Sequence, residues 1–269
     1  MSEDDEKRKQ EFYERTMGQL DEMCAKVIED PDDQMRLLRY AKGLVNTITI
    51  FGMSGDPEGI DLVLNRFRIL VEEYGNIDEI QIQFATALAN SMSYLMKKQK
   101  FEQTYERLEE LRMFARSYPM NMSCQRSLAG GLVNSIINFG QRGLMEPVKQ
   151  IIRELLVLAN AHKENHEIQL ALAKGLVNSL GYLSKNQQFD MAIPLIDELM
   201  ALTEAYPDDE DFILQRANGI VTAMGAFAKD EEYIDVVEEL EDELERMAKV
   251  YPDHEGVQLR AKTRSLGRD

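Results

Sequence analysis

Four asparagines stand at a constant spacing of 44 residues, and their side chains could hold a polypeptide. They are Asn46, Asn90, Asn134 and Asn178. A side-chain amide offers two N–H donors and an acceptor oxygen, which match the hydrogen-bonding groups of a peptide bond. A row of such amides could therefore bind an extended main chain without reading its side chains.

Further polar and aromatic side chains fall on the same predicted helix face as the asparagines, and none of them is acidic. They are Arg39, Lys42, Tyr94, Asn138, Lys174 and Tyr182. The cations would favour a carboxylate. The predicted ligand is thus an extended or helical protein segment with acidic character or a free C-terminal carboxylate. The asparagine column has a second interpretation, because a recurrent amide could simply bond to a neighbouring helix.

Other arrangements that support chemistry are weak or missing from the sequence. His162 and His166 stand four residues apart, but the predicted register places them across a turn, where this spacing does not bring two metal ligands onto one face. No GxxxxGK(S/T), GxGxxG, HExxH or GxSxG motif occurs. Paired glutamates are more typical of a solvated helix face than of an acid/base dyad. We therefore expect a non-enzymatic protein without a metal site or a cofactor.

The 44-residue period extends to a whole helix around each asparagine. Apolar residues recur there at intervals of three or four, which predicts an amphipathic helix of about 20 residues, named helix A. A short turn leads to a second apolar-periodic stretch, helix B, which in several copies ends at a Tyr-Pro pair where proline prevents continuation. One column of helix A is constant in all six copies: Ala41, Ala85, Ala129, Ala173, Ala217 and Ala261.

The columns of helix A divide into distinct faces on a wheel of about 100° per residue. The alanine and large apolar columns point to one side, and the asparagine column lies directly opposite. A column of glycine or alanine, which includes Gly43 and Gly175, lies on the flank. We expect this column to let adjacent A helices approach closely, which explains a glycine that otherwise costs about 1 kcal/mol inside a helix.

The period also sets the predicted domain organisation. Residues 1–10 form a flexible acidic N-terminus, and residues 11–269 form a single α-solenoid domain of about twelve helices. This domain starts with a half repeat, 11–32, which has the helix-B pattern and stops at Pro31. Units of 44 residues continue to about residue 252, and residues 253–269 start another helix A.

The small residues and leucine at fixed spacing in helix A, the apolar helix B and the closing Tyr-Pro-Asp resemble tetratricopeptide-type repeats. The resemblance covers nearly the whole chain from about residue 11. The unit is longer than the usual ~34 residues and the chain has no tryptophan, so HEAT-like repeats are the competing description. The resemblance implies an all-α, right-handed superhelix of antiparallel helices, with helix A lining a concave surface that binds a protein or peptide.

Charge and cysteine content restrict the partners and the compartment. With 48 acidic and 31 basic residues, the net charge of -17 disfavours nucleic acid and anionic membranes, which are polyanions. Cys24 and Cys124 have no framework spacing, which is typical of reduced thiols. No apolar signal or membrane-spanning stretch is present. These features predict a cytoplasmic protein.

The predicted function is a scaffold or adaptor that binds a protein segment on the face lined by helix A. A second hypothesis is a self-assembling structural protein, in which the terminal half repeats 11–32 and 253–269 stack end to end into homo-oligomers. A third hypothesis, modular RNA binding with one base per repeat, agrees with an asparagine ladder but conflicts with the net negative charge.

Overall fold

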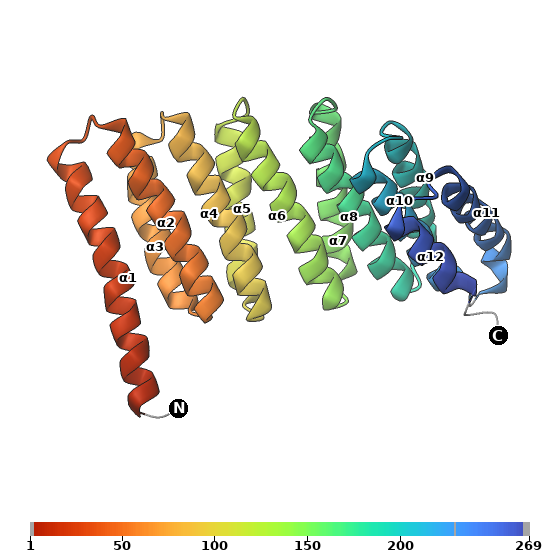
Figure 1. Ribbon diagram of the computed structural model, residues 1–269, viewed down its shortest axis with the longest axis horizontal. Helices are drawn as coiled ribbons and strands as arrows, with labels where there is room; N and C mark the ends of the chain where they lie inside the picture. Colours follow the sequence, from red (N-terminus) through yellow and green to blue (C-terminus); the bar gives the residue numbers. More distant parts are fainter. Residues whose placement is uncertain (1–2, 229, 266–269) are drawn as a thin grey trace. The chain divides into compact units, whose positions relative to one another are not determined.

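The computed structural model describes residues 3–228 and 230–265, and this part of the chain is all-α. It contains twelve α-helices and one short 3-10 helix, without a strand (Figure 1). None of these described helices is long and apolar enough to cross a membrane. The chain divides into two compact units, Met1–Gly131 (unit 1) and Leu132–Asp269 (unit 2), with the division inside α6.

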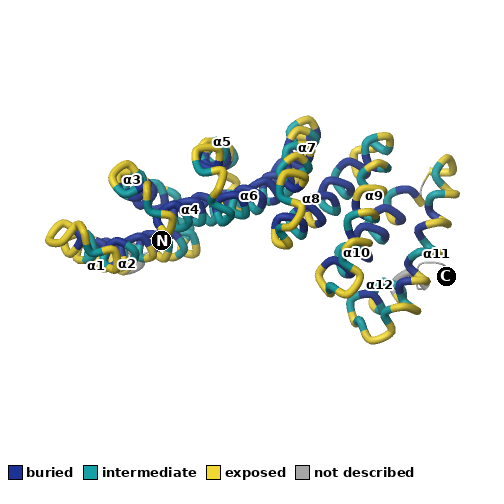
Figure 2. Tube along the Cα trace, turned by 90° about the horizontal axis from the view of Figure 1, so that it is seen from above, coloured by how far each residue is buried: buried dark blue, intermediate teal, exposed yellow. Residues whose placement is uncertain are grey.

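Unit 1 is a two-layer arrangement of antiparallel helices. Its helices are α1 (Glu3–Glu29), α2 (Gln34–Ser54), α3 (Pro57–Tyr74), α4 (Asp78–Lys97), α5 (Phe101–Ser117) and the first half of α6 (Met122–Gln141). We call the even-numbered helices A helices and the odd-numbered ones B helices. Figure 2 shows α2 and α4 in one layer, with α3 and α5 packed on the same side of it. Residues 3–10, expected as a flexible segment, continue helix α1.

Unit 2 also consists of two layers of helices. After the second half of α6 it contains α7 (Met145–Ala161), α8 (His166–Lys185), α9 (Phe189–Glu204), α10 (Glu210–Phe227), the 3-10 turn η1 (Glu231–Tyr233), α11 (Ile234–Val250) and α12 (Glu255–Ser265). In Figure 2 α8, α10 and α12 form one layer and α9 and α11 the other.

The spacing of helix starts reproduces the period of the sequence. The first residues of five A helices lie 44 residues apart: Gln34, Asp78, Met122, His166 and Glu210. The residue before the helix is an N-cap whose side chain accepts backbone N–H bonds at Asp33, Asn165 and Asp209, which stabilises a helix start at that point. The periodic pattern therefore fixes where the A helices begin.

The core lies between the A and B layers and uses the predicted alanine column. Ala41, Ala85, Ala129, Ala173 and Ala217 are at most 1% exposed. The glycine column faces a different neighbour from the one expected. A Cβ at Gly175 would lie 2.5 Å from Leu155 of the preceding B helix but 3.5 Å from Ile136 of the preceding A helix. The glycine thus first makes room for a leucine of helix B.

A buried glutamine joins the end of a B helix to the start of the next A helix. The Gln125 Nε2 atom donates to the carbonyls of Ala115 and Tyr118, at 2.9 and 3.2 Å. Gln169 makes the same pair of bonds to Ala159 and His162, at 2.8 and 3.1 Å. Carbonyls at a helix C-terminus have no partner within the helix, so each glutamine satisfies two of them and fixes the corner between the layers.

Candidate functional site

Most of the predicted binding residues reach the surface of their A helices, but to different extents. Asn46, Arg39, Lys42 and Lys174 are exposed. The residues that are half-buried are Asn90, Asn134, Asn178, Tyr94 and Tyr182, while Asn138 is buried. The asparagine column therefore does not form a uniform row.

In unit 1 the structure brings three of the predicted residues together. Arg39, Lys42 and Asn46 line one shallow pocket of about 290 Å³ beside α1, together with Met23, Met35 and Leu38. No acidic residue lines this pocket. Neither cation forms an ion pair with a described residue, and the Asn46 amide has no hydrogen bond there. The pocket thus offers two free positive charges and a free amide.

Local helix geometry explains how these three side chains meet. They follow each other at intervals of three and four residues along α2, so they lie on one face of the helix. The start of α2 is held by Arg36, which donates to the carbonyl of Lys26 at 2.9 Å and pairs with Glu29. This contact joins the end of α1 to α2, and therefore fixes the side of the pocket that Met23 of α1 supplies.

A second amide stands on the neighbouring A helix of unit 1. Asn90 lies on α4, which packs directly against α2, and is half-buried. Its side chain makes no hydrogen bond with a described residue. Asn46 and Asn90 therefore both keep free hydrogen-bonding groups, as a peptide-binding amide requires.

In unit 2 the asparagines have a more structural character. The Asn178 Nδ2 atom donates to the carbonyl of Lys174, one turn earlier in α8, at 2.8 Å. Asn138 is 2% exposed, and its Nδ2 atom has no hydrogen-bond partner among the described residues. Burial keeps Asn138 away from any surface groove. Lys174 is exposed and forms no ion pair with a described residue.

Tyr94 and Tyr182 pack against glycines of the preceding A helix. A Cβ at Gly52 would lie 2.2 Å from the Tyr94 ring, and one at Gly140 would lie 2.1 Å from the Tyr182 ring. Burial raises the pKa of Tyr182, against an opposing hydrogen bond from the Gln141 side chain. One face of each ring thus joins two A helices, so these tyrosines act in packing as well as on the surface.

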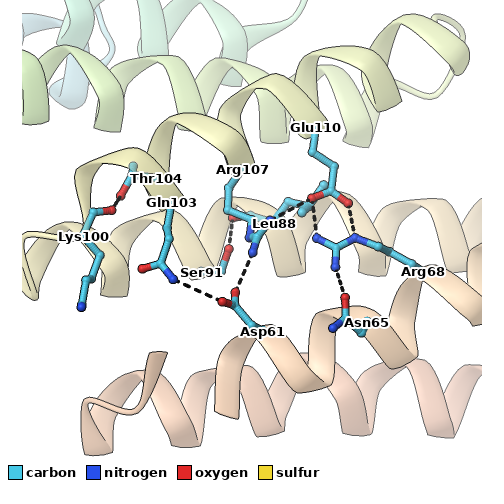
Figure 3. Close-up of polar contacts among 10 residues, drawn as sticks. All are labelled: Asp61, Asn65, Arg68, Leu88, Ser91, Lys100, Gln103, Thr104, Arg107 and Glu110. Atoms are coloured by element: carbon cyan, nitrogen blue, oxygen red, sulfur yellow. Dashed lines mark hydrogen bonds and ion pairs between the residues drawn. The ribbon is translucent and has the colours of Figure 1, made fainter. Parts of the chain in front are cut away.

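The strongest polar network lies on the B helices and was not predicted. The Arg107 guanidinium joins Asp61 at 2.6 Å and Glu110 at 3.5 Å, and Arg68 binds both oxygens of Glu110 at 2.6 and 2.8 Å (Figure 3). Gln103 donates to Asp61 at 3.3 Å. Two cations and two carboxylates balance each other, which is the pattern of a clamp between α3 and α5 rather than of a site for a charged ligand.

A signal for this network does exist in the sequence. Arg107 stands in a column where the neighbouring units have Val63 and Ile151, both fully or nearly fully buried. A charge in an apolar column has to find a partner, because an unpaired buried charge is costly. The sequence predicted that the acids of the B helices form a solvated face. Asp61 and Glu110 instead form ion pairs between helices, so this prediction does not hold for all of these acids.

His166 makes structural contacts at the start of α8. His166 begins α8, and its Nε2 atom lies 2.6 Å from the carboxylate of Asp209, the N-cap of α10. Its ring packs edge-on against Tyr206 and Phe212. Within the described part of the chain no group of three or more His, Cys, Asp or Glu residues could hold a metal ion. His166 therefore links the start of α8 to the start of α10.

Comparison with protein-family models, with curated proteins and with solved structures finds no significant similarity to this chain.

Proposed function

We propose that this chain is a cytoplasmic, non-enzymatic scaffold or adaptor of the tetratricopeptide-like class. In this proposal its helices form a right-handed superhelix, and its A helices bind a protein segment. The ligand has acidic character or a free C-terminal carboxylate. Its negatively charged end lies in the pocket lined by Arg39, Lys42 and Asn46.

One observation carries the proposal: two cations without ion pairs line the same pocket as a free amide in a chain of net charge -17. Several arginines of this acidic protein form ion pairs, as Arg36, Arg66 and Arg68 do. Charge-assisted hydrogen bonds to a carboxylate are about twice as strong as neutral ones. Arg39 and Lys42 thus supply a local attraction that the rest of the surface opposes.

The apolar part of the pocket supports the same class of ligand. Met35 is 70% exposed and lines the pocket beside the cations. Methionine side chains are flexible and polarisable, and adapt to different partner side chains. A carboxylate next to an apolar residue fits this combination, and Asn90 on the neighbouring helix could bind the following peptide group.

The experiment uses a fluorescein-labelled, glutamate-rich decapeptide with a free C-terminus and its C-terminally amidated twin. Fluorescence anisotropy measures binding to the wild-type chain and to Arg39→Glu/Lys42→Glu. A control variant, Lys163→Glu/Lys249→Glu, changes the net charge by the same amount at two other exposed lysines. Circular dichroism checks that all variants keep their helix content.

We expect the charge-reversed pocket to bind at least tenfold more weakly, while the control variant keeps most of the affinity. Binding should weaken as salt is added, because exposed charges are screened. Equal loss in both variants would mean that only net charge matters, and would contradict the pocket as the site. A difference between the free and amidated peptides assigns a role to the terminal carboxylate.

Self-assembly is the second candidate, and exposed apolar side chains on the first and last helices favour it. Phe12 and Ile28 of α1 are 46% and 72% exposed, and Leu259 of α12 is 63% exposed. Sedimentation velocity over a dilution series tests it. Assembly that disappears in Phe12→Ser/Ile28→Ser would support this function, and a monomer at all concentrations would refute it.

A further inference from the structure

A cavity of about 550 Å³ lies in unit 2 near the C-terminal ends of α8 and α10. Small side chains and glycines form part of its wall, and an aromatic ring and polar groups form the rest. The residues that matter for its chemistry are Ser184, Lys185, Phe189, Thr222, Ala226 and Asp230. The volume is within the usual range for small-molecule pockets, about 300–1,000 Å³.

The period of the chain explains why a cavity is present at this contact. In two other contacts between A helices, a tyrosine of the later helix lies on a glycine of the earlier one: Tyr94 on Gly52 and Tyr182 on Gly140. In the contact of α8 with α10, the corresponding positions, 44 residues after Tyr182 and Gly140, hold Ala226 and Ser184. The chain therefore supplies no ring here, and both residues line the cavity.

The polar side of the cavity has a counterpart at the contact of Tyr182 with the preceding A helix. The Gln141 side chain faces the Tyr182 hydroxyl as a hydrogen-bonding group that opposes the rise of its pKa. The residue 44 positions after Gln141 is Lys185, which lines the cavity and forms no ion pair with a described residue. A phenol hydroxyl in the cavity could thus accept a hydrogen bond from the Lys185 ammonium, as the Tyr182 hydroxyl does from the amide of Gln141.

Two further features favour an aromatic guest with a polar group. Phe189 is part of an aromatic cluster, with its ring centroid 5.1 Å from that of Phe227 and 5.0 Å from that of Tyr233. A guest ring could extend this cluster, because aromatic rings pair favourably at such distances. Ser184 is 4% exposed, and its Oγ atom has no hydrogen-bond partner among the described residues. A guest hydroxyl could satisfy it after rotation of the side chain.

We propose that this cavity is a binding site for a phenol ring, as carried by tyrosine, with the ring against Phe189 and the hydroxyl bound by Lys185. The Asp230 carboxylate on the same wall repels a phosphorylated ring and so selects the unmodified phenol. The site lies on another unit than the pocket of Arg39 and Lys42, and does not depend on the function proposed for that pocket.

The test measures binding of p-cresol, toluene and N-acetyl-tyrosinamide to the full chain by saturation-transfer NMR. We expect p-cresol to bind several-fold more tightly than toluene, which has the ring without the hydroxyl. Binding of N-acetyl-tyrosinamide would identify tyrosine in a chain as the natural source, and binding of p-cresol alone would indicate a free phenol. Absence of binding by both phenols would overturn the proposal.

Variants locate the bound ring. Ala226→Tyr supplies the tyrosine that the other two contacts have, and should reduce p-cresol binding at least tenfold while raising the melting temperature. Tyr182→Ala opens the corresponding place on Gly140 and is a positive control, because cavities opened in this way can take up small aromatic molecules. Unchanged p-cresol binding in a folded Ala226→Tyr chain would refute the assignment.

Lys185 provides a matched pair that does not depend on filling the cavity. Lys185→Met keeps the length of the side chain but removes its donors, and should weaken p-cresol binding several-fold without affecting toluene. Lys185→Gln recreates the group that serves Tyr182 and should retain most of the p-cresol affinity. Equal p-cresol affinity for Lys185→Met and wild type would refute the role of Lys185.

Discussion

Replacing Gln169 by methionine tests how the two helix layers are joined. Methionine has a similar length and shape but no hydrogen-bond donor, so the change removes the bonds to the carbonyls of Ala159 and His162 with little change in packing. Gln169 is 5% exposed and Ala159 is 1% exposed, so water cannot replace the bond to Ala159.

The magnitude follows from the burial of the two acceptors. A buried polar group left without a partner costs about 1–3 kcal/mol. The carbonyl of His162 belongs to a half-buried residue, so its loss is nearer the net value of one hydrogen bond, about 1 kcal/mol. The more apolar methionine regains about 1 kcal/mol by burial. We expect a net loss of about 2 kcal/mol, or about 4–8 °C in melting temperature for a unit of this size.

The assay is urea unfolding followed by far-UV circular dichroism, with Gln150→Met as the control. Gln150 lies on the exposed side of α7, so the same chemical change there should cost less than about 0.5 kcal/mol, as is usual for surface positions. A Gln169→Met chain as stable as the control would show that the corner bonds do not hold the layers together.

Three further predictions concern other contacts. Gly140→Ala should cost about 1–3 kcal/mol by overpacking, because its Cβ would lie 2.1 Å from the Tyr182 ring; in a Tyr182→Ala background the cost should vanish, which a double-mutant cycle of unfolding free energies measures. Burial raises the pKa of Cys124 to about 12, so iodoacetamide at mildly alkaline pH should label Cys24 alone in the native chain, and labelling of Cys124 before unfolding would contradict this. The hydrogen bond from His166 lowers the pKa of Asp209, so the stability it contributes is present above the usual Asp pKa and is lost as the pH falls through the lowered value. His166→Gln should move the Asp209 pKa part of the way back, and an unchanged carboxyl titration by NMR would exclude the pair as the cause.

The helices could be predicted from sequence because their signals are local. An amphipathic period, an N-cap such as Asp33 and a proline in the first turn such as Pro57 act within one or two turns of the chain. The amphipathic period returns in each unit, and the starts of five A helices lie 44 residues apart. The all-α class is therefore confirmed, and five of the six alanines of the constant column are buried, while Ala261 is half-buried.

The roles of individual side chains depended on partners about 42 residues away. Tyr94 faces the surface on a helical wheel, but the glycine at position 52 lets its ring lie on the preceding helix. A wheel for one helix contains no information about that neighbour. The wheel likewise places Asn138 at the surface, whereas it is 2% exposed in the structure.

Differences between the copies are therefore more informative about function than the features they share. A constant column, such as the alanines, serves the packing that every unit needs. Arg107 in an apolar column forms an ion-pair network, and Ala226, at the position that holds Tyr182 in the preceding unit, lines a cavity. Arg39 and Lys42 likewise stand beside Asn46 without the acids that accompany other arginines of the chain. Binding by this protein should therefore depend on the positions where one unit departs from the others, and substitution of a shared residue should change stability first.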